Sequence, residues 1–275
     1  MSQEDLMLSY HVSNYDRNFL IKIEKQQYED FKKYNVQLKK YTNIFDCYQN
    51  YKNSEAMIEN YIRTIDDRDN RNLNDIYRNC KYLFVQNIIF GRVFIDNIKS
   101  YCKQLDRFDL KREISNFERL DEFKMLKLLR DYAQHFSLPF SNLRTHYSPM
   151  QEKTTGIEPL ISTYELNQNK NGNKQNTEYL KTLKEEEISI VTYFEKWSVA
   201  IDELFLKVKD DFLLLTDSQM KQFIVSSILC FIGVNDFIPV GIAKAKQLNN
   251  HVGMYQTEEF IPFDELVLVD LFFEK

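Results

Sequence analysis

Glycine and proline, the residues that most often interrupt helices, are scarce in this chain of 275 residues. The sequence has only 6 Gly and 5 Pro, and four of the prolines come after position 145. Proline ends or kinks a helix, and glycine weakens one. A first half with so few of either residue therefore predicts long helices joined by few tight turns.

Apolar side chains in this first half recur every three or four residues, which is the spacing of one helical face. The pattern predicts a long helix over residues 17–48, a shorter helix that begins at about 53–54, and a central helix from 74 or 75 to about 105. The run 66–72 has no apolar side chain and should be a loop.

Two residues stand out on the apolar face of the central helix. A buried amide needs hydrogen-bond partners, so Asn87 is either a satisfied core residue or part of a site near Arg130 and His135. Gly91 in mid-helix lowers helix stability by roughly 1 kcal/mol relative to alanine. We expect its role to be the close approach of another helix.

The second half of the chain has a different pattern of residue types. Residues 144–166 mix β-branched and aromatic residues with Pro and Gly, which predicts one or two strands, or a hairpin. The polar run 167–176 should be a flexible loop. A charged helix is predicted over about 177–209. A capping box at 216–219 should open a hydrophobic helix that ends near residue 233. Strand is predicted within 260–273.

Together these patterns predict a mainly α protein with a small β component in the C-terminal half. We expect a helical region, residues 1–145, followed by a mixed α/β region, residues 146–275. A single continuous domain is the alternative that the sequence leaves open.

The most informative stretch ends a further amphipathic helix. Residues 115–118, Ser-Asn-Phe-Glu, have the pattern of a capping box that opens a helix, and Pro139 should stop that helix. Its expected apolar face comprises Phe117, Leu120, Phe123, Leu126, Leu129 and Tyr132, widened by Met125 and Leu128. Arg130 and His135 therefore fall in the last turns, where a buried helix meets solvent.

Arg130 and His135 are separated by five positions, or roughly 140° around a helix. They can contact one ligand if the helix end is distorted, or if a second copy of the chain supplies the other half of the site. In a symmetric dimer, two such helix ends would place two arginines and two histidines in one cleft. We therefore expect a homodimer formed through this face.

Arg130, four intervening residues and His135, with the polar Asp131 directly after the arginine, resemble the signature of the HEPN superfamily. The wider phrase over 129–139 is similar to one in uncharacterised bacterial HEPN-like proteins, and the resemblance covers about residues 72–142. It implies a HEPN-like helical bundle. Many HEPN proteins are metal-independent endoribonucleases of toxin–antitoxin, phage-defence and RNA-processing systems, whereas others are non-catalytic binding or dimerisation modules.

The resemblance implies RNA cleavage of the toxin or phage-defence type, in which the RNA supplies its own 2′-hydroxyl as nucleophile. Arg130 would bind the scissile phosphate. His135, an imidazole with an unperturbed pKa of about 6.5, would act as acid and base. The expected site comprises the catalytic residues Arg130, His135 and Asp131 and the substrate-binding residues Gln134, Lys127 and Arg144. Neither a metal ion nor a cofactor is expected to take part.

Two alternatives remain open. The chain can be a non-catalytic HEPN-like module that binds RNA, a nucleotide or a protein partner and dimerises. It can also be a helical interaction protein in which Arg130 pairs with a core carboxylate and His135 caps a helix end. The resemblance adds an antitoxin or another defence-system protein as an expected partner.

Charge is distributed unevenly along the chain. The formal net charge is −5, which argues against a large, non-specific nucleic-acid footprint. The segment 111–146 differs, because it holds seven Lys or Arg against five Asp or Glu. This segment is either a solvated helix face or a local binding site.

Cysteine usage and the N-terminus indicate an intracellular protein. Cys47, Cys80, Cys102 and Cys230 lack metal-ligand spacing and are expected to be reduced core thiols. The acidic first five residues do not resemble a secretion signal. The most apolar run, 223–234, is too short to span a bilayer. We expect a cytoplasmic protein without a membrane partner.

Overall fold

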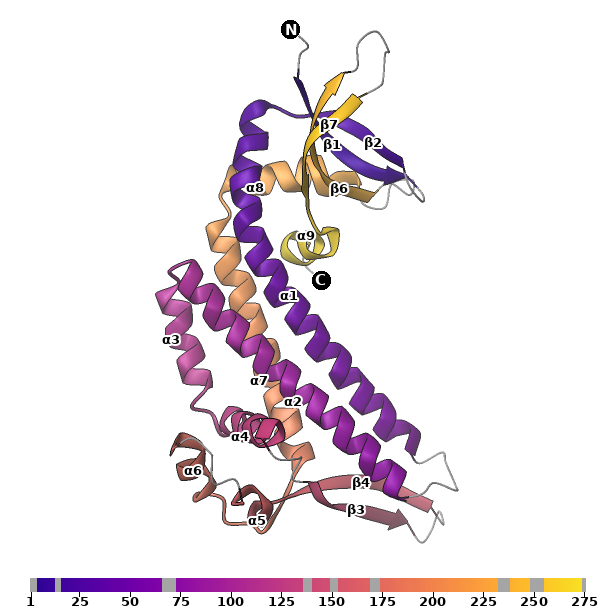
Figure 1. Ribbon diagram of the computed structural model, residues 1–275, viewed down its shortest axis with the longest axis vertical. Helices are drawn as coiled ribbons and strands as arrows, with labels where there is room; N and C mark the ends of the chain where they lie inside the picture. The colour runs from indigo at the N-terminus through magenta and orange to yellow at the C-terminus, as the bar shows by residue number, and fades with distance from the viewer. Residues whose placement is uncertain are drawn as a thin grey trace. The chain divides into compact units, whose positions relative to one another are not determined.

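The mainly α fold class is confirmed by the computed structural model (Figure 1). The structure describes residues 4–12, 16–65, 73–135, 140–148, 153–168, 174–231, 238–247 and 255–273. None of the helices in these ranges combines the length and the apolar character that a membrane-spanning segment requires.

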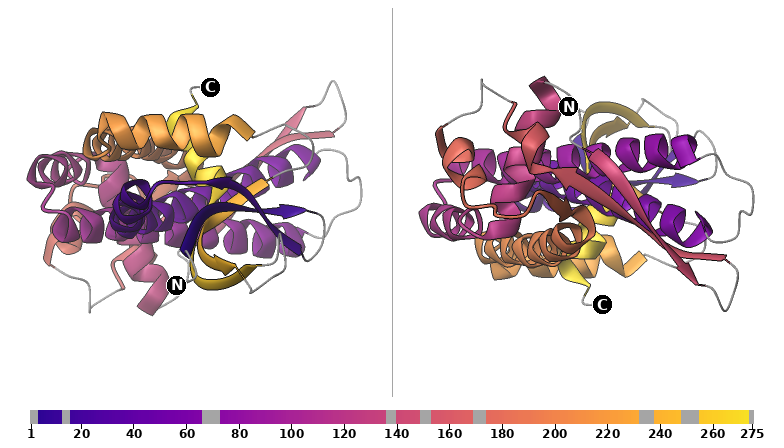
Figure 2. Two further views of the ribbon diagram at one scale, coloured as in Figure 1. Left: turned by 90° about the horizontal axis from the view of Figure 1, so that it is seen from above. Right: turned by 90° about the horizontal axis from the view of Figure 1, so that it is seen from below.

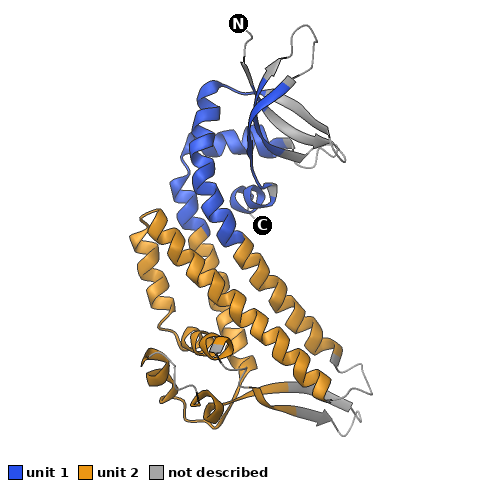
Figure 3. Cartoon of the chain, viewed as in Figure 1, with its two compact units in different colours: residues 1–45, 209–275 blue, residues 46–208 orange. Residues whose placement is uncertain are grey.

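The chain divides into two compact units (Figure 3). Unit 1 comprises residues 1–45 and 209–275, and unit 2 comprises residues 46–208. Two helices, α1 (Lys25–Ile65) and α7 (Ile190–Leu215), contribute residues to both units. The boundary predicted near residue 145 falls inside a strand of unit 2, β3 (Phe140–Ser148).

Unit 1 contains an antiparallel sheet of four strands in the order β2-β1-β6-β7. The strands are β1 (Glu4–Val12), β2 (Asp16–Lys22), β6 (Ile238–Gln247) and β7 (Tyr255–Pro262). The first and last parts of the chain thus share one sheet, with Leu8 opposite Ile242. The prediction that strands are confined to the C-terminal half is therefore wrong.

The long first helix differs from its prediction at both ends. Because residues 16–22 pair with β1, α1 begins at Lys25 and not at Arg17. It then continues without a break to Ile65, and the expected second helix at 53–54 is part of it. The Ser54 hydroxyl donates to the carbonyl oxygen of Tyr51 (2.6 Å) from inside the helix instead of capping a new one.

Aspartate side chains begin the two C-terminal helices of unit 1. Asp217 accepts from the Met220 amide (2.7 Å) and opens α8 (Ser218–Phe223), which continues as a π-helix and a 3-10 turn to Phe231. The expected helix is confirmed as far as Phe231, but Asp217 caps it and not Thr216, the first residue of the predicted capping box. Asp264 accepts from the Leu266 amide (2.9 Å) and opens α9 (Glu265–Phe272). The strand expected within 260–273 is therefore wrong beyond Pro262.

Aromatic rings fill the core of unit 1. The Phe31 ring of α1 lies edge-on to those of Phe223 and Phe263, with centroids 6.1 and 5.8 Å away. The Tyr41 ring stacks on Phe212 of α7 at 4.9 Å. These contacts hold α1, α7 and α8 together within this unit.

Unit 2 is built from helices and a three-stranded sheet in the order β3-β4-β5. Its helices, besides parts of α1 and α7, are α2 (Leu73–Gln104), α3 (Phe108–Phe117), α4 (Asp121–His135), α5 (Thr163–Leu166) and α6 (Lys174–Leu180). β3 and β4 (Lys153–Ser162) form a long hairpin (Figure 2), and β5 (Glu187–Ser189) pairs with β4. The central helix and the hairpin are confirmed.

Two predictions about the chain after the hairpin are corrected. The charged helix expected over 177–209 is two helices, α6 and α7, separated by β5, because residues 187–189 pair with β4. The loop expected over 167–176 includes the start of α6 at Lys174. The loop expected over 66–72 lies outside the described residues.

Two of the four cysteines are buried, as expected, but the others are not. Cys80 and Cys102 are buried, Cys47 is half-buried and Cys230 is exposed. Burial raises the pKa of the Cys80 thiol to about 11. The prediction of a core thiol is therefore wrong for Cys230.

Asn87 is a satisfied core asparagine. Its amide nitrogen donates to the Ser54 hydroxyl (3.0 Å), and its amide oxygen accepts from the Trp197 indole (3.1 Å). Asn87 therefore links α2 to α1 and α7 inside the core of unit 2.

Gly91 allows neighbouring helices to approach α2 closely, as the sequence predicts. A Cβ at this position would lie 3.3 Å from the side chains of Ile201 and Leu126 and 3.5 Å from Tyr51. These residues belong to α7, α4 and α1. Three helices thus pack against one point of α2.

We predict that Asn87→Ala lowers the free energy of unfolding by about 1–3 kcal/mol, because it leaves the buried Trp197 indole without an acceptor. Denaturant unfolding followed by the fluorescence of Trp197, the single tryptophan, measures this change. Asn97→Ala on the same helix is the control, since its amide donates to the Val93 carbonyl one turn earlier in an exposed hydrogen bond. It should change stability by about 0.5 kcal/mol or less, and equal losses in both variants would contradict the assignment.

Candidate functional site

The helix that carries Arg130 begins later than its sequence pattern suggests. α4 starts at Asp121, and Ser115 lies inside α3, where its hydroxyl donates to the Lys111 carbonyl (3.0 Å). The capping box expected at 115–118 is therefore wrong. The Glu118 carboxylate pairs with the Lys99 ammonium (2.5 Å) of α2, so a tertiary contact replaces the expected cap.

The buried face of α4 follows the predicted stripe from Phe123 onward. The buried members are Phe123, Met125, Leu126, Leu128, Leu129 and Tyr132. Leu120 precedes the helix and is 41% exposed, and Phe117 ends α3. The core contact of α4 is thus confirmed, while its expected first turn is not.

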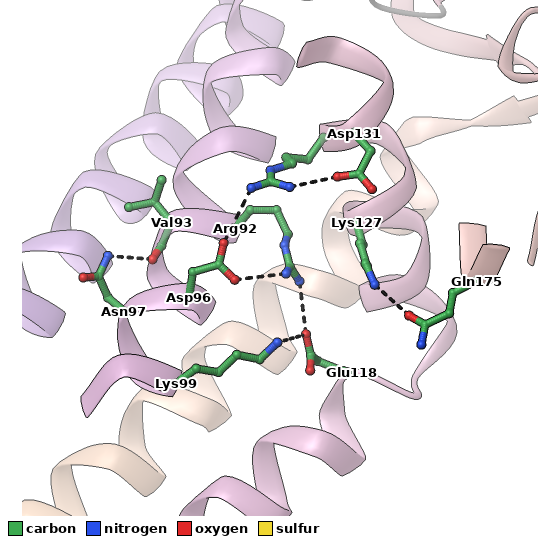
Figure 4. Close-up of polar contacts among 10 residues, drawn as sticks. Arg92, Val93, Asp96, Asn97, Lys99, Glu118, Lys127, Asp131 and Gln175 are labelled. Carbon is green, nitrogen blue, oxygen red and sulfur yellow. Dashed lines mark hydrogen bonds and ion pairs between the residues drawn. The ribbon is translucent and has the colours of Figure 1, made fainter. Parts of the chain in front are cut away.

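Arg130 lies on α4 with its guanidinium held by two carboxylates. Its Nη1 donates to Oδ1 of Asp131 (2.8 Å), and its Nη2 lies 3.7 Å from Oδ2 of Asp96 on α2 (Figure 4). The side chain remains 31% exposed. This arrangement fixes the direction of the guanidinium at the surface and also compensates part of its charge.

Two further residues of the expected site contact α6. Oδ2 of Asp131 accepts from the buried Asn176 amide (2.6 Å). One turn earlier, the Lys127 ammonium donates to the Gln175 amide oxygen (2.8 Å), as Figure 4 shows. Lys127 and Asp131 thus lie beside α6, and Asp131 also binds Arg130.

The other expected residues lie elsewhere or outside the described side chains. His135 is the last residue of α4, and its side chain lies outside the described residues. Gln134 is exposed at the same helix end. Arg144 on β3 pairs with Glu158 across the hairpin (Nη1 to Oε2, 3.0 Å) and not with a residue of α4.

The sequence does not reveal the arginine on which this region depends, Arg92. Its side chain is only 5% exposed. Its Nη2 lies 3.2 Å from Oδ1 of Asp96, and its Nη1 lies 3.5 Å from Oε1 of Glu118 (Figure 4). The available signal is the spacing of Arg92, Asp96 and Lys99 at i, i+4 and i+7, which puts them on one face of α2.

Two carboxylates in this region each serve two cations. Asp96 pairs with Arg92 and Arg130, and Glu118 pairs with Arg92 and Lys99. Within the ranges that the structure covers, no three His, Cys, Asp or Glu side chains are grouped so that they could bind a metal ion. Arg130 and Lys127, which are both partly exposed, are the cations of the expected site that could contact an anion here.

Comparison with protein-family models, curated proteins and solved structures finds no match to this chain. The HEPN assignment accordingly depends on the sequence around Arg130 and His135 alone, and it stays a prediction.

We predict that Arg92→Ala destabilises the protein more than Arg130→Ala. Removal of the buried Arg92 side chain leaves a cavity and takes one of its two cations from each of Asp96 and Glu118, and should lower the free energy of unfolding by about 2–4 kcal/mol. Arg130 is partly exposed, and its loss should cost about 1 kcal/mol or less. Denaturant unfolding of both variants measures the difference, and an equal or larger loss for Arg130→Ala would indicate that its ion pairs are chiefly structural.

Proposed function

We propose that this chain binds RNA at the surface of α4 and cleaves it without a metal ion. The observation that carries the proposal is the part-exposed Arg130 guanidinium, which Asp131 and Asp96 hold in one direction beside Lys127. A cation whose orientation is already fixed loses little entropy when it binds a phosphate. The resemblance to HEPN ribonucleases adds His135, five positions further along the same helix.

The proposed chemistry uses groups that RNA and the chain supply. The 2′-hydroxyl of the RNA attacks the adjacent phosphate, with His135 as the base that accepts its proton. The 5′-oxygen of the next nucleotide leaves and takes a proton from protonated His135, which thus acts as both base and acid. Arg130 binds the non-bridging phosphate oxygens and stabilises the charge that develops on them. Gln134 and Lys127 would bind the flanking RNA.

In this proposal Asp131 is a positioning residue, whereas the family resemblance predicts a catalytic role for it. Its carboxylate accepts from Arg130 and from Asn176, so it positions the guanidinium and anchors α4 to α6. A carboxylate next to a phosphate site is unfavourable unless a cation separates the two. Arg130 meets that requirement if phosphate binds on its exposed side.

A non-catalytic HEPN-like module that binds RNA or a protein partner and dimerises is the second candidate. The observation that favours it is the charge balance at Arg130, where two carboxylates lie within 4 Å of one guanidinium. Such compensation weakens the attraction for a scissile phosphate. An antitoxin or defence-system partner follows from the family resemblance alone.

Incubation of the purified chain with tRNA and total RNA in EDTA separates the two candidates. We predict cleavage that EDTA does not inhibit, with products that end in a 2′,3′-cyclic phosphate. His135→Ala and Arg130→Ala should abolish it, and Arg130→Lys should not restore it, because an ammonium cannot replace a planar two-pronged contact with phosphate.

Arg112→Ala, which removes an exposed arginine on α3, is the matched control and should leave cleavage unchanged. RNA binding without cleavage by the wild-type chain would support the non-catalytic module. Cleavage that survives His135→Ala would exclude the proposed mechanism.

We further predict a homodimer in which the Arg130 ends of two α4 helices face each other. On a regular helix, Arg130 and His135 point roughly 140° apart, so a second copy is the simplest source of the complementary residue. Sedimentation equilibrium at micromolar concentration measures the mass. Mixing Arg130→Ala with His135→Ala chains should restore part of the activity, whereas an active monomer would contradict the prediction.

A further inference from the structure

A cavity of about 820 Å³ lies beside the Arg92 network, between residues of α2, α3, α4 and α6. Its charged lining comprises the cations Arg92, Lys99, Arg119, Lys124 and Lys127 and the carboxylates Glu118, Asp121 and Glu178. The lining thus has a net charge of +2, five cations less three acids, in a chain of net charge −5. The sign of this cavity is opposite to that of the whole molecule.

Three of these cations have no carboxylate partner among the residues that the structure describes: Arg119, Lys124 and Lys127. The Lys127 ammonium donates to a neutral amide, that of Gln175 (2.8 Å). The Lys124 ammonium lies 5.9 Å from the centroid of the Tyr179 ring, a cation–π contact. These three cations therefore give the cavity positive charge that no described carboxylate compensates.

The buried donor atoms of Arg92 are a second, independent indication that this cavity binds an anion. Its Nε and Nη1 atoms are buried and have no hydrogen-bond acceptor in the described part of the chain. The Glu118 carboxylate lies 3.5 Å from Nη1 and also serves Lys99, while Asp96 pairs with Nη2. Buried donors without acceptors are costly, and a guanidinium stays charged when it is buried. A phosphate at this point would supply the acceptors.

The rest of the lining suits an organic group more than a bare ion. Phe123 and Tyr179 lie in its wall, where they are 1% and 7% exposed, and Gln175, Asn176 and Thr182 contribute hydrogen-bonding groups. Burial raises the pKa of the Tyr179 phenol, so this ring is neutral at physiological pH. Sites for small ligands commonly have volumes of roughly 300–1,000 Å³ and combine apolar walls with a few polar groups.

We propose that this cavity binds a small phosphorylated molecule of the nucleotide class. Its phosphate contacts Arg92, Lys124 and Arg119, and its organic part lies against the wall in which Phe123 and Tyr179 are buried. The residues placed here against the ligand are not those assigned to RNA cleavage, although Lys127 also lines the cavity and Arg92 shares Asp96 with Arg130.

Isothermal titration calorimetry of the full chain with ATP, AMP, adenosine and inorganic phosphate tests the proposal. ATP and AMP should bind, and adenosine should bind at least about tenfold more weakly because it lacks the phosphate. The double variant Arg119→Ala/Lys124→Ala, at two exposed positions, should weaken nucleotide binding by about tenfold or more. Lys111→Ala/Arg112→Ala on α3 removes the same two charges outside the lining and should have no effect.

Several outcomes would overturn the proposal: no binding of ATP or AMP to the folded chain, adenosine binding as tightly as AMP, or equal losses in the two double variants. A short single-stranded RNA is the further probe. If it binds and loses affinity in Arg119→Ala/Lys124→Ala while ATP and AMP do not bind, the cations belong to a polynucleotide site instead. Cleavage by the wild-type chain and by His135→Ala, measured separately, reports on the proposed function without reference to this cavity.

Discussion

Two carboxylates that each hold two cations connect α2, α3 and α4. Asp96 pairs with Arg92 and Arg130, and Glu118 pairs with Arg92 and Lys99. Isolated surface ion pairs contribute little to stability. A buried guanidinium such as that of Arg92 is different, because a desolvated charge requires its partners. The direction of Arg130 therefore depends on a buried residue that the Arg130–His135 motif does not contain.

The elements that could be predicted from the sequence are those whose signal is local. α2 has a continuous apolar face, and its predicted bounds agree with Leu73–Gln104. β1 pairs with β2, its neighbour in sequence, and also with β6, which lies more than 200 positions further along the chain, with Leu8 opposite Ile242; this second pairing leaves no local signal in the sequence. The short apolar run at 266–269 fits strand or helix equally well, and the cap at Asp264 decides for helix.

The candidate site was predictable only in part, for a related reason. Helical spacing alone places Lys127, Arg130 and Asp131 near one another on α4, but their partners come from α2 and α6. The pattern at 115–118 is the same whether Glu118 caps a helix or pairs with Lys99. Only the tertiary packing of α3 against α2 selects the ion pair, and no local pattern encodes that choice.

The acidic composition of the chain limits what its cationic region can bind. Charges further apart than about 8–10 Å are largely screened at physiological ionic strength, so the surplus acids elsewhere do not prevent a phosphate from binding beside Arg92 or Arg130. The surplus acids do, however, remove the long-range electrostatic attraction that basic proteins have for polyanions. Affinity must then come from a few short contacts with buried or oriented guanidinium groups. Such a site favours one or two phosphate groups over a long stretch of nucleic-acid backbone, and this constraint applies equally to the surface of α4 and to the cavity next to it.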